Sequence, residues 1–326
     1  MKLIIGLILC AAMATGCARS KDAASGPFDM TEYQQVVERH KDEQTAEPSP
    51  PPANPEMTAE EHERAGDASA QLRNYAMAGV HYSKALKADP SRNTVRLKLG
   101  QLLLDQKLLE PAIAQFRDYL KQDPDSSLAY QGLGQSYLLQ GNTEEAESAL
   151  VKSIDLDPTN WVSHNLLGLL YDQRKEHIKA IAAYKSALAL RPREPSVLNN
   201  LGLAYALSGD HESAIQAYEQ ALTAGSTNHK LYNNLGIAYA QRHRYVEALE
   251  SFKKGADEPL AYNNLGVALL GMGRPRQAAV CFEKAIELNP LYYEKASDNL
   301  RQARQALASD KNGTSASQQP ATVSCP

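Results

Sequence analysis

The sequence predicts an all-α fold in which about seven helical hairpins stack in order and one further helix covers the last of them. Two observations predict this: a glycine that recurs at a fixed interval, and a small residue paired with an aromatic one in the same register. The interval is 34 residues between the first six glycines and 30 before the last: Gly66, Gly100, Gly134, Gly168, Gly202, Gly236 and Gly266. Such a period is typical of repeat proteins, in which each unit buries its apolar face only against its neighbours.

The first helix of each unit surrounds the glycine, which we number as position eight of its unit. Leucine precedes the glycine in six units, and leucine or tyrosine follows it three residues later. These columns are Leu99, Leu133, Leu167, Leu201, Leu235 and Leu265, then Leu103, Tyr137, Tyr171, Tyr205, Tyr239 and Leu269. Because residues three and four apart share one face of a helix, the columns predict one buried helical face.

A second helix in each unit is predicted by an alanine that stands four residues before an aromatic residue or leucine. The alanines are Ala78, Ala112, Ala146, Ala180, Ala214, Ala248 and Ala278, and their partners are Tyr82, Phe116, Leu150, Tyr184, Tyr218, Phe252 and Phe282. A spacing of four again places both residues on one face of an amphipathic helix. Proline, which cannot continue a helix, closes five units at Pro90, Pro124, Pro158, Pro192 and Pro290.

These columns resemble the tetratricopeptide repeat, and one unit carries them as Tyr130, Leu133, Gly134, Tyr137, Ala146, Leu150 and Pro158. The resemblance covers residues 59–292 and implies a right-handed superhelical solenoid. Its seven repeats would span residues 59–92, 93–126, 127–160, 161–194, 195–228, 229–258 and 259–292. The sixth repeat is four residues short, which is about one helical turn.

The N-terminal residues 1–16 are typical of a cleavable export leader, because Lys2 precedes an apolar run that is shorter than the roughly 20 residues of a membrane-spanning helix. The small residues before Cys17 resemble a bacterial lipobox. That resemblance implies that Cys17 carries lipid, palmitate included, and that the protein is anchored at the outer membrane and faces the periplasm. Cleavage after Ala14 stays open as an alternative that would release a soluble periplasmic protein.

The remaining ends of the chain differ in composition from the repeats. Residues 17–58 are proline-rich and acidic, which predicts a disordered tether between the lipid and the first repeat. Residues 293–309 keep a helical apolar spacing and predict a capping helix. Residues 310–326 are rich in Ser, Gln, Thr and Ala, and predict a disordered tail.

Composition narrows the classes of function. The repeats occupy most of the 326 residues and leave no room for a catalytic domain, so we expect no enzyme activity. The formal net charge of −4 does not provide the positive surface of a nucleic-acid-binding protein. We therefore expect a protein or peptide client, with no nucleic acid, metal or cofactor.

Cysteines and histidines suggest no reactive or metal site. Cys281 and Cys325 can pair, but Cys281 stands in a column of small residues, which favours a packing role, while Cys325 belongs to the predicted disordered tail. No two of the eight histidines have a spacing typical of metal ligands, and His62 and His164 share a column that faces the hairpin partner. We expect both to be packed.

A candidate binding groove follows from positions five, six and nine of the first helices, since resemblance to the family implies that this stripe lines the concave face. Asparagine fills positions five and six in the C-terminal half, and aliphatic residues fill position nine. The predicted groove residues are Asn165, Asn199, Asn200, Asn233, Asn234, Asn263 and Asn264, with Leu203, Ile237 and Val267. Since asparagine both donates and accepts hydrogen bonds, a ladder of asparagines suits an extended peptide backbone. Bridging between adjacent helices is an equally supported role.

Function is inferred from the arrangement as a whole. A lipoprotein leader followed by tetratricopeptide repeats resembles the tight-adherence pilus assembly lipoproteins and pilotins, which implies a scaffold for pilus or secretion-system assembly. An adaptor that recruits peptidoglycan hydrolases is the alternative within binding proteins. An accessory subunit of a glycosyltransferase system is a third interpretation, disfavoured because no further domain follows the capping helix.

Overall fold

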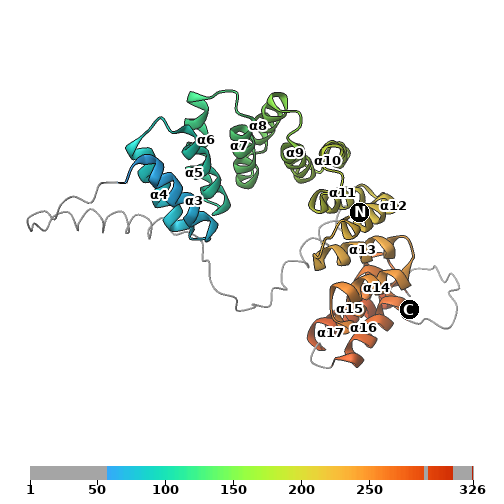
Figure 1. Ribbon diagram of the computed structural model, residues 1–326. Helices are drawn as coiled ribbons and strands as arrows, with labels where there is room; N and C mark the ends of the chain where they lie inside the picture. Colours follow the sequence, from blue (N-terminus) through green and yellow to red (C-terminus); the bar gives the residue numbers. More distant parts are fainter. Residues whose placement is uncertain (1–56, 290–292, 311–324, 326) are drawn as a thin grey trace, which may run out of the picture. The chain divides into compact units, whose positions relative to one another are not determined.

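The computed structural model describes residues 57–289, 293–310 and 325, which form fifteen helices and no strand (Figure 1). The fold is an all-α tetratricopeptide-repeat solenoid of consecutive helical hairpins, as the sequence predicts. The chain divides into two compact units at Asp89 and Pro90. Each unit is described by itself below.

The N-terminal unit contains one hairpin, made of α3 (Ala59–Gln71) and α4 (Tyr75–Ala88). Thr58 begins α3 with a capping box, because its hydroxyl accepts from the Glu61 backbone N–H while the Glu61 carboxylate accepts from the Thr58 backbone N–H. The two helices are tied by the Tyr82 hydroxyl, which donates to Asp67 over 2.8 Å. This hairpin therefore has both an ordered start and an internal polar link.

The C-terminal unit contains six further hairpins and a closing helix, with each hairpin packed on the next. The hairpins are α5 (Asn93–Asp105) with α6 (Leu109–Gln122), α7 (Ser127–Gln140) with α8 (Thr143–Leu156), α9 (Trp161–Gln173) with α10 (His177–Leu190), α11 (Pro195–Ser208) with α12 (His211–Thr223), α13 (His229–Gln241) with α14 (Tyr245–Gly255), and α15 (Glu258–Gly271) with α16 (Pro275–Leu288). The closing helix is α17 (Tyr293–Asp310), which packs on α15 and α16.

The recurring glycine lies against the aromatic residue or leucine of its own hairpin. A Cβ atom built on Gly202 would lie 2.5 Å from the Tyr218 ring, and one on Gly168 would lie 2.4 Å from the Tyr184 ring. The other pairs are Gly66 with Tyr82, Gly100 with Phe116, Gly134 with Leu150, Gly236 with Phe252, and Gly266 with Phe282. Any side chain at this column would overpack the hairpin, which explains the 34-residue glycine register.

The turn inside every hairpin uses one left-handed residue at position fifteen. Glycine holds it in three hairpins, but a larger residue holds it in four, with φ between 58° and 62°. The seven residues are Arg73, Lys107, Gly141, Lys175, Gly209, His243 and Gly273. Because only glycine signals this conformation in a sequence, four of the seven turns carry no sequence signal.

The shortened sixth hairpin lacks a turn at the end of its second helix. Helix α14 has 11 residues, whereas most of its counterparts have 14. The next helix begins one residue before the predicted boundary, at Glu258, because the Asp257 carboxylate accepts from the Leu260 backbone N–H and caps it. The missing turn is thus replaced by a short capped connection.

A disulfide joins Cys281 of α16 to Cys325, with their Cα atoms 5.1 Å apart. Cys281 is fully buried, and Cys325 packs against the same core. The pairing that the sequence left open is therefore present, and the packing role that the small-residue column favours accounts only for the burial of Cys281. The repeat position of Cys281 correctly predicts that this residue lies in the core. It cannot predict the disulfide, because the partner Cys325 is distant in the sequence and lies outside the repeats.

Several predictions fall outside the described residues. The leader, the lipid attachment at Cys17, nearly all of the tether and residues 311–324 belong to this group. Within the described ranges, no helix combines the length and the apolar character needed to cross a membrane.

Candidate functional site

Asparagines at positions five and six form hydrogen bonds between the first helices of successive hairpins. The Asn200 side-chain N–H of α11 donates to the Asn165 carbonyl oxygen of α9 over 3.2 Å. The Asn264 N–H of α15 donates to the Asn233 oxygen of α13 over 3.1 Å. The bridging role that the sequence left open is therefore present at two junctions.

Along the series of first helices α9, α11, α13 and α15, the junction between α11 and α13 lacks this bond. Among the described residues, the Asn199 carbonyl oxygen of α11 is buried without a hydrogen-bond partner, and Asn234 of α13, which stands in the donor column, forms no side-chain bond to it. A buried acceptor without a partner costs about 1 to 3 kcal/mol. The α11–α13 junction is thus the weakest step of the asparagine ladder.

Each asparagine bridge uses only half of the hydrogen-bonding capacity of its two amides. In the α9–α11 bridge, no bond within the described chain occupies the Asn165 N–H groups or the Asn200 oxygen. The same holds for the Asn233 N–H groups and the Asn264 oxygen. Each bridged junction therefore keeps a donor and an acceptor, the two groups that a peptide backbone needs.

Aliphatic residues lie beside the ladder on the surface. Leu203 is 39% exposed and Val267 is 38% exposed, while Ile237 is half-buried. Leu207, one turn after Leu203 on α11, is 51% exposed and extends the stripe. Sequence reasoning missed Leu207, although its spacing of four from Leu203 was the signal that could have found it.

Asn263 differs from its predicted place in an open groove. It is only 1% exposed, and its oxygen accepts from the Asn299 side chain of α17 over 2.9 Å. The physical reason is that α17 packs on α15 and covers its position-five side chain. The accessible part of the stripe therefore lies on α9, α11 and α13, and on the part of α15 that α17 does not cover.

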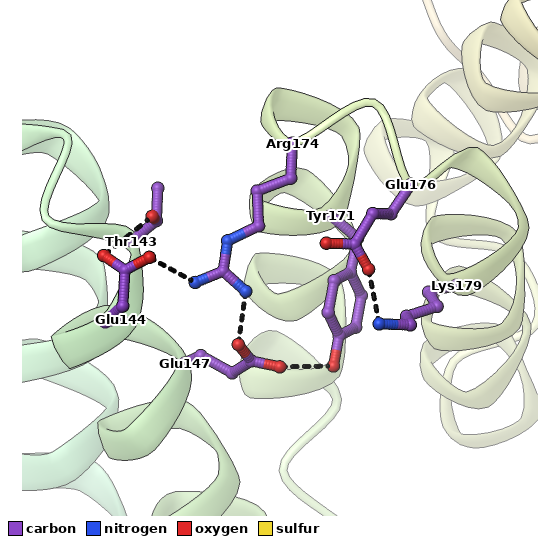
Figure 2. A network of polar contacts seen from close by, with 7 residues as sticks. All are labelled: Thr143, Glu144, Glu147, Tyr171, Arg174, Glu176 and Lys179. Atoms are coloured by element: carbon purple, nitrogen blue, oxygen red, sulfur yellow. Dashed lines mark hydrogen bonds and ion pairs between the residues drawn. The ribbon is translucent and has the colours of Figure 1, made fainter.

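A polar network surrounds Tyr171 at the α8, α9 and α10 junction (Figure 2). The Tyr171 hydroxyl donates to Glu147 over 2.9 Å, and Arg174 pairs with Glu147 and, over 3.4 Å, with Glu144. Partial burial and the bond to Glu147 raise the pKa of Tyr171 to about 12. Burial opposes ionisation of Glu147, but its bonds to Arg174 and Tyr171 hold its pKa below the usual value. The carboxylates of Glu144 and Glu147 and the guanidinium of Arg174 are thus paired with one another, and the network supports the packing of these helices.

His62 and His81 form a pair across the N-terminal hairpin, with their Nδ1 atoms 3.1 Å apart. The fold brings together residues that are 19 positions apart, a contact that the spacing of the histidines in the sequence does not predict. Burial, and the positive charge of Lys84, lower the pKa of both rings. Among the described residues, no group of three His, Cys, Asp or Glu could hold a metal.

The N-terminal hairpin is expected to lose stability as the pH falls from 7.5 to 5.5. Since the folded-state pKa of His62 and His81 lies below their ordinary value, the unfolded state binds more protons below about pH 6.5. Lys84 opposes protonation of both rings, and Glu61 favours it at His62. Amide hydrogen exchange of α4 is the measurement, with α15 and α16 as the internal reference. The same loss in His62→Asn would contradict the role of the pair.

The asparagine bridge is expected to contribute about 1 kcal/mol to the free energy of unfolding. Asn264→Ala removes the donor to Asn233, whereas Asn234→Ala changes the same column at the junction without a bond. Urea denaturation should therefore show Asn264→Ala as the more destabilised variant of the two. Equal stabilities would show that the bridge is energetically neutral.

Family comparisons agree with this arrangement. One family match covers residues 11–264 and is described as the C-terminal domain of cilia and flagella-associated protein 70. A second match, to the tetratricopeptide repeat, covers residues 259–292. No curated protein matches the chain.

Solved structures share the fold. PilW, described as a widely conserved type IV pilus biogenesis factor, is 19% identical with a TM-score of 0.58, covering 65% of this chain and 98% of its own. A tetratricopeptide repeat protein from Parabacteroides merdae is 16% identical with a TM-score of 0.53, covering 76% and 98%. MamA is 30% identical over 51% of this chain and 91% of its own, with a TM-score of 0.45.

The glycine register, the consecutive hairpins and a family match over most of the chain agree with one another. The arrangement is a scaffold for protein–protein interaction, a role that tetratricopeptide repeats typically serve without catalysis. The chain belongs to the tetratricopeptide-repeat family, within the group described as the cilia and flagella-associated protein 70 C-terminal domain.

Proposed function

We propose that this scaffold binds an extended segment of a client protein along the first helices α9, α11, α13 and α15. The observation that carries the proposal is the half-used asparagine ladder beside exposed aliphatic side chains. A peptide backbone would donate to the Asn200 oxygen and accept from the Asn165 N–H groups. Its apolar side chains would contact Leu203 and Val267.

The spacing of the ladder suits an extended chain. Packed helices lie about 8 to 10 Å apart, and an extended peptide rises about 3.3 Å per residue. Successive first helices would therefore meet about every third residue of the client. Since amide and aliphatic side chains make up the stripe, the bound segment would be neutral and partly apolar.

The unmatched Asn199 oxygen gives the α11–α13 junction a particular role. A client N–H would reach this buried acceptor only after the side chains that cover it move aside, and the new bond would then offset the cost of leaving the oxygen unpaired. Binding would then be strongest at α11, where Leu203 and Leu207 are both exposed.

We also propose that the scaffold works in the bacterial cell envelope, anchored by lipid on Cys17 at the periplasmic face of the outer membrane, and assists pilus or secretion-system assembly. The leader and lipobox pattern supports the location. The Cys281–Cys325 disulfide also supports it, since disulfides persist in oxidising compartments. The likeness to PilW shows the fold alone at 19% identity, so the pilus role is proposed from the sequence resemblance to tight-adherence lipoproteins.

Site-specific photo-crosslinking tests the groove and names the client. A photoreactive residue is placed at Leu203 and, as a matched control, at Gln216, which is exposed on the second helix α12 of the same hairpin. We expect an adduct with an envelope protein from Leu203 in intact cells and none from Gln216. A pilus or secretion component as the adduct supports the proposed role, whereas a wall hydrolase supports the adaptor role.

Leu203→Asp then separates binding from folding. A charge at this position, which is 39% exposed, is expected to leave the protein folded in a thermal melt but to abolish the interaction with the identified client. Normal client binding by Leu203→Asp, or equal crosslinking from Gln216, would overturn the groove.

A further inference from the structure

Tyrosine stands at position eleven of four first helices, where it meets the second helix of the preceding hairpin. In three of these junctions the hydroxyl has a charged hydrogen-bond partner on that second helix. The pairs are Tyr137 with Arg117, Tyr171 with Glu147, and Tyr239 with Glu219. The fourth hydroxyl, that of Tyr205 on α11, forms no hydrogen bond with any described residue. Because the buried side-chain atoms that lack a partner do not include this oxygen, it reaches the surface.

A lysine without an ionic partner lies beside this tyrosine. The Lys185 ammonium of α10 lies 5.6 Å from the centre of the Tyr205 ring. The side chain is exposed and forms no ion pair within the part of the chain that the structure describes. Lys253 stands at the same position of the sixth repeat, lies 5.1 Å from the Tyr262 ring centre and pairs with Glu258 over 2.6 Å. A lysine beside a tyrosine ring thus holds a carboxylate at one junction and none at the other.

The α10–α11 junction has no free carboxylate of its own. Neither α10 nor α11 contains Asp or Glu. The glutamates that directly precede these helices are already bonded, Glu176 to Lys179 and Glu194 to the Ser196 hydroxyl. The positive charge of Lys185 is therefore not balanced by either helix.

The outer end of the junction differs from its neighbours in the same way. At three other junctions, a glutamate at position eighteen of the second helix bonds to the next first helix. These contacts are Glu110 with Gln140, Glu144 with Arg174, and Glu212 with Arg242. At the α10–α11 junction this position holds Ile178, which is 75% exposed. The approach to Lys185 and Tyr205 along α10 is thus open and carries no acidic group.

The repeat register shows where a carboxylate would bind. Glu219 and Lys185 both stand at position twenty-five, and each meets a tyrosine at position eleven of the next repeat. With Glu219, the protein itself supplies the acceptor for the Tyr239 hydroxyl. With Lys185, the junction presents a hydroxyl and an ammonium, both of which donate hydrogen bonds to a carboxylate.

We propose that the α10–α11 junction binds an aspartate or glutamate side chain of a partner protein. Its carboxylate would accept from the Tyr205 hydroxyl, as Glu219 accepts from Tyr239, and would pair with the Lys185 ammonium. Two residues along a helix correspond to a rotation of about 200°, so Tyr205 faces away from Leu203 and Leu207 of the groove. The site is therefore separate from the asparagine groove and does not need it to be occupied.

The probe is N-acetyl-glutamate methylamide added to the full-length protein, with the uncharged N-acetyl-glutamine methylamide as the matched ligand. We expect the glutamate compound to shift the NMR signals of Tyr205 and Lys185 but not those of Tyr239, whose hydroxyl already bonds to Glu219. The glutamine compound should bind about tenfold more weakly, because it carries no charge. Added salt should weaken binding of the glutamate compound. Equal binding of both compounds, or equal shifts at Tyr239, would overturn the site.

Variants complete the test. Tyr205→Phe and Lys185→Gln each remove one donor and are expected to weaken binding of the glutamate compound by about threefold or more. Lys185→Glu places a carboxylate where Glu219 stands in the next repeat and should abolish binding. Lys254→Gln, at an exposed lysine of α14, is the matched control and should leave binding unchanged. Thermal melts check that each variant is folded. Unchanged affinity in a folded Lys185→Gln protein would refute the proposal, whatever the outcome at the groove.

Discussion

Reduction of the Cys281–Cys325 disulfide is expected to lower the free energy of unfolding of the C-terminal hairpin by about 4 kcal/mol. The bond closes a loop with a sequence separation of 44 residues, and closing a loop of that length removes much conformational entropy from the unfolded chain. Because the loop contains α17, the effect should concentrate in α15, α16 and α17. Amide hydrogen exchange with and without a reductant measures it.

Cys325→Ser is the matched variant for this prediction. It removes the bond but leaves the buried Cys281 as a thiol of almost the same size, so the core changes little. We expect the variant to resemble the reduced protein and to show no response to the reductant. Equal protection of α17 in the oxidised and reduced proteins would contradict a stabilising role for the disulfide.

Phe116→Ala is expected to cost about 3 to 5 kcal/mol of the free energy of unfolding. The ring is 1% exposed and fills the space left by two glycines, because a Cβ atom on Gly100 would lie 2.8 Å from it and one on Gly132 would lie 2.4 Å from it. Since each hairpin is stabilised mainly by its neighbours, a cavity here should uncouple α5 and α6 from the hairpins that follow. Urea denaturation should then show two transitions.

The control is a pair of substitutions that adds volume at Gly132 and removes volume at Phe116. Gly132→Ala alone should destabilise the protein by about 1 to 3 kcal/mol through overpacking. Combined with Phe116→Leu, the added methyl group gains space, so the double variant should be more stable than the sum of the two single effects indicates. Strict additivity would show that the ring and the glycine do not share one packing site.

The hairpins could be predicted from the sequence because each of their determinants is local. Gly202 and Tyr218 occupy fixed positions within one 34-residue unit, and the close contact between them is repeated in every hairpin. The left-handed turns at Lys107, Lys175 and His243 could not be predicted, because the conformation is imposed by the two helices on either side and not by a residue preference.

The candidate site was only partly predictable. The asparagine stripe follows from the repeat register, but the partners of each amide depend on how two hairpins pack, so the bond at Asn264 and the unmatched oxygen at Asn199 needed coordinates. Burial of Asn263 required the position of α17, and the His62–His81 pair required the α3–α4 packing. Contacts between separate units of a repeat array leave no periodic signal of their own.

Asn299 of α17 meets Asn263 much as an asparagine of one first helix meets that of the next. The closing helix therefore occupies the position that the first helix of an eighth hairpin would take. The disulfide joins Cys325 to the same core. Because α17 covers this face of α15 and α16, a hairpin of a second molecule cannot pack at the C-terminal end of the array. Many copies at high density on one surface should then give a high local concentration of binding sites without polymerising head to tail into fibres.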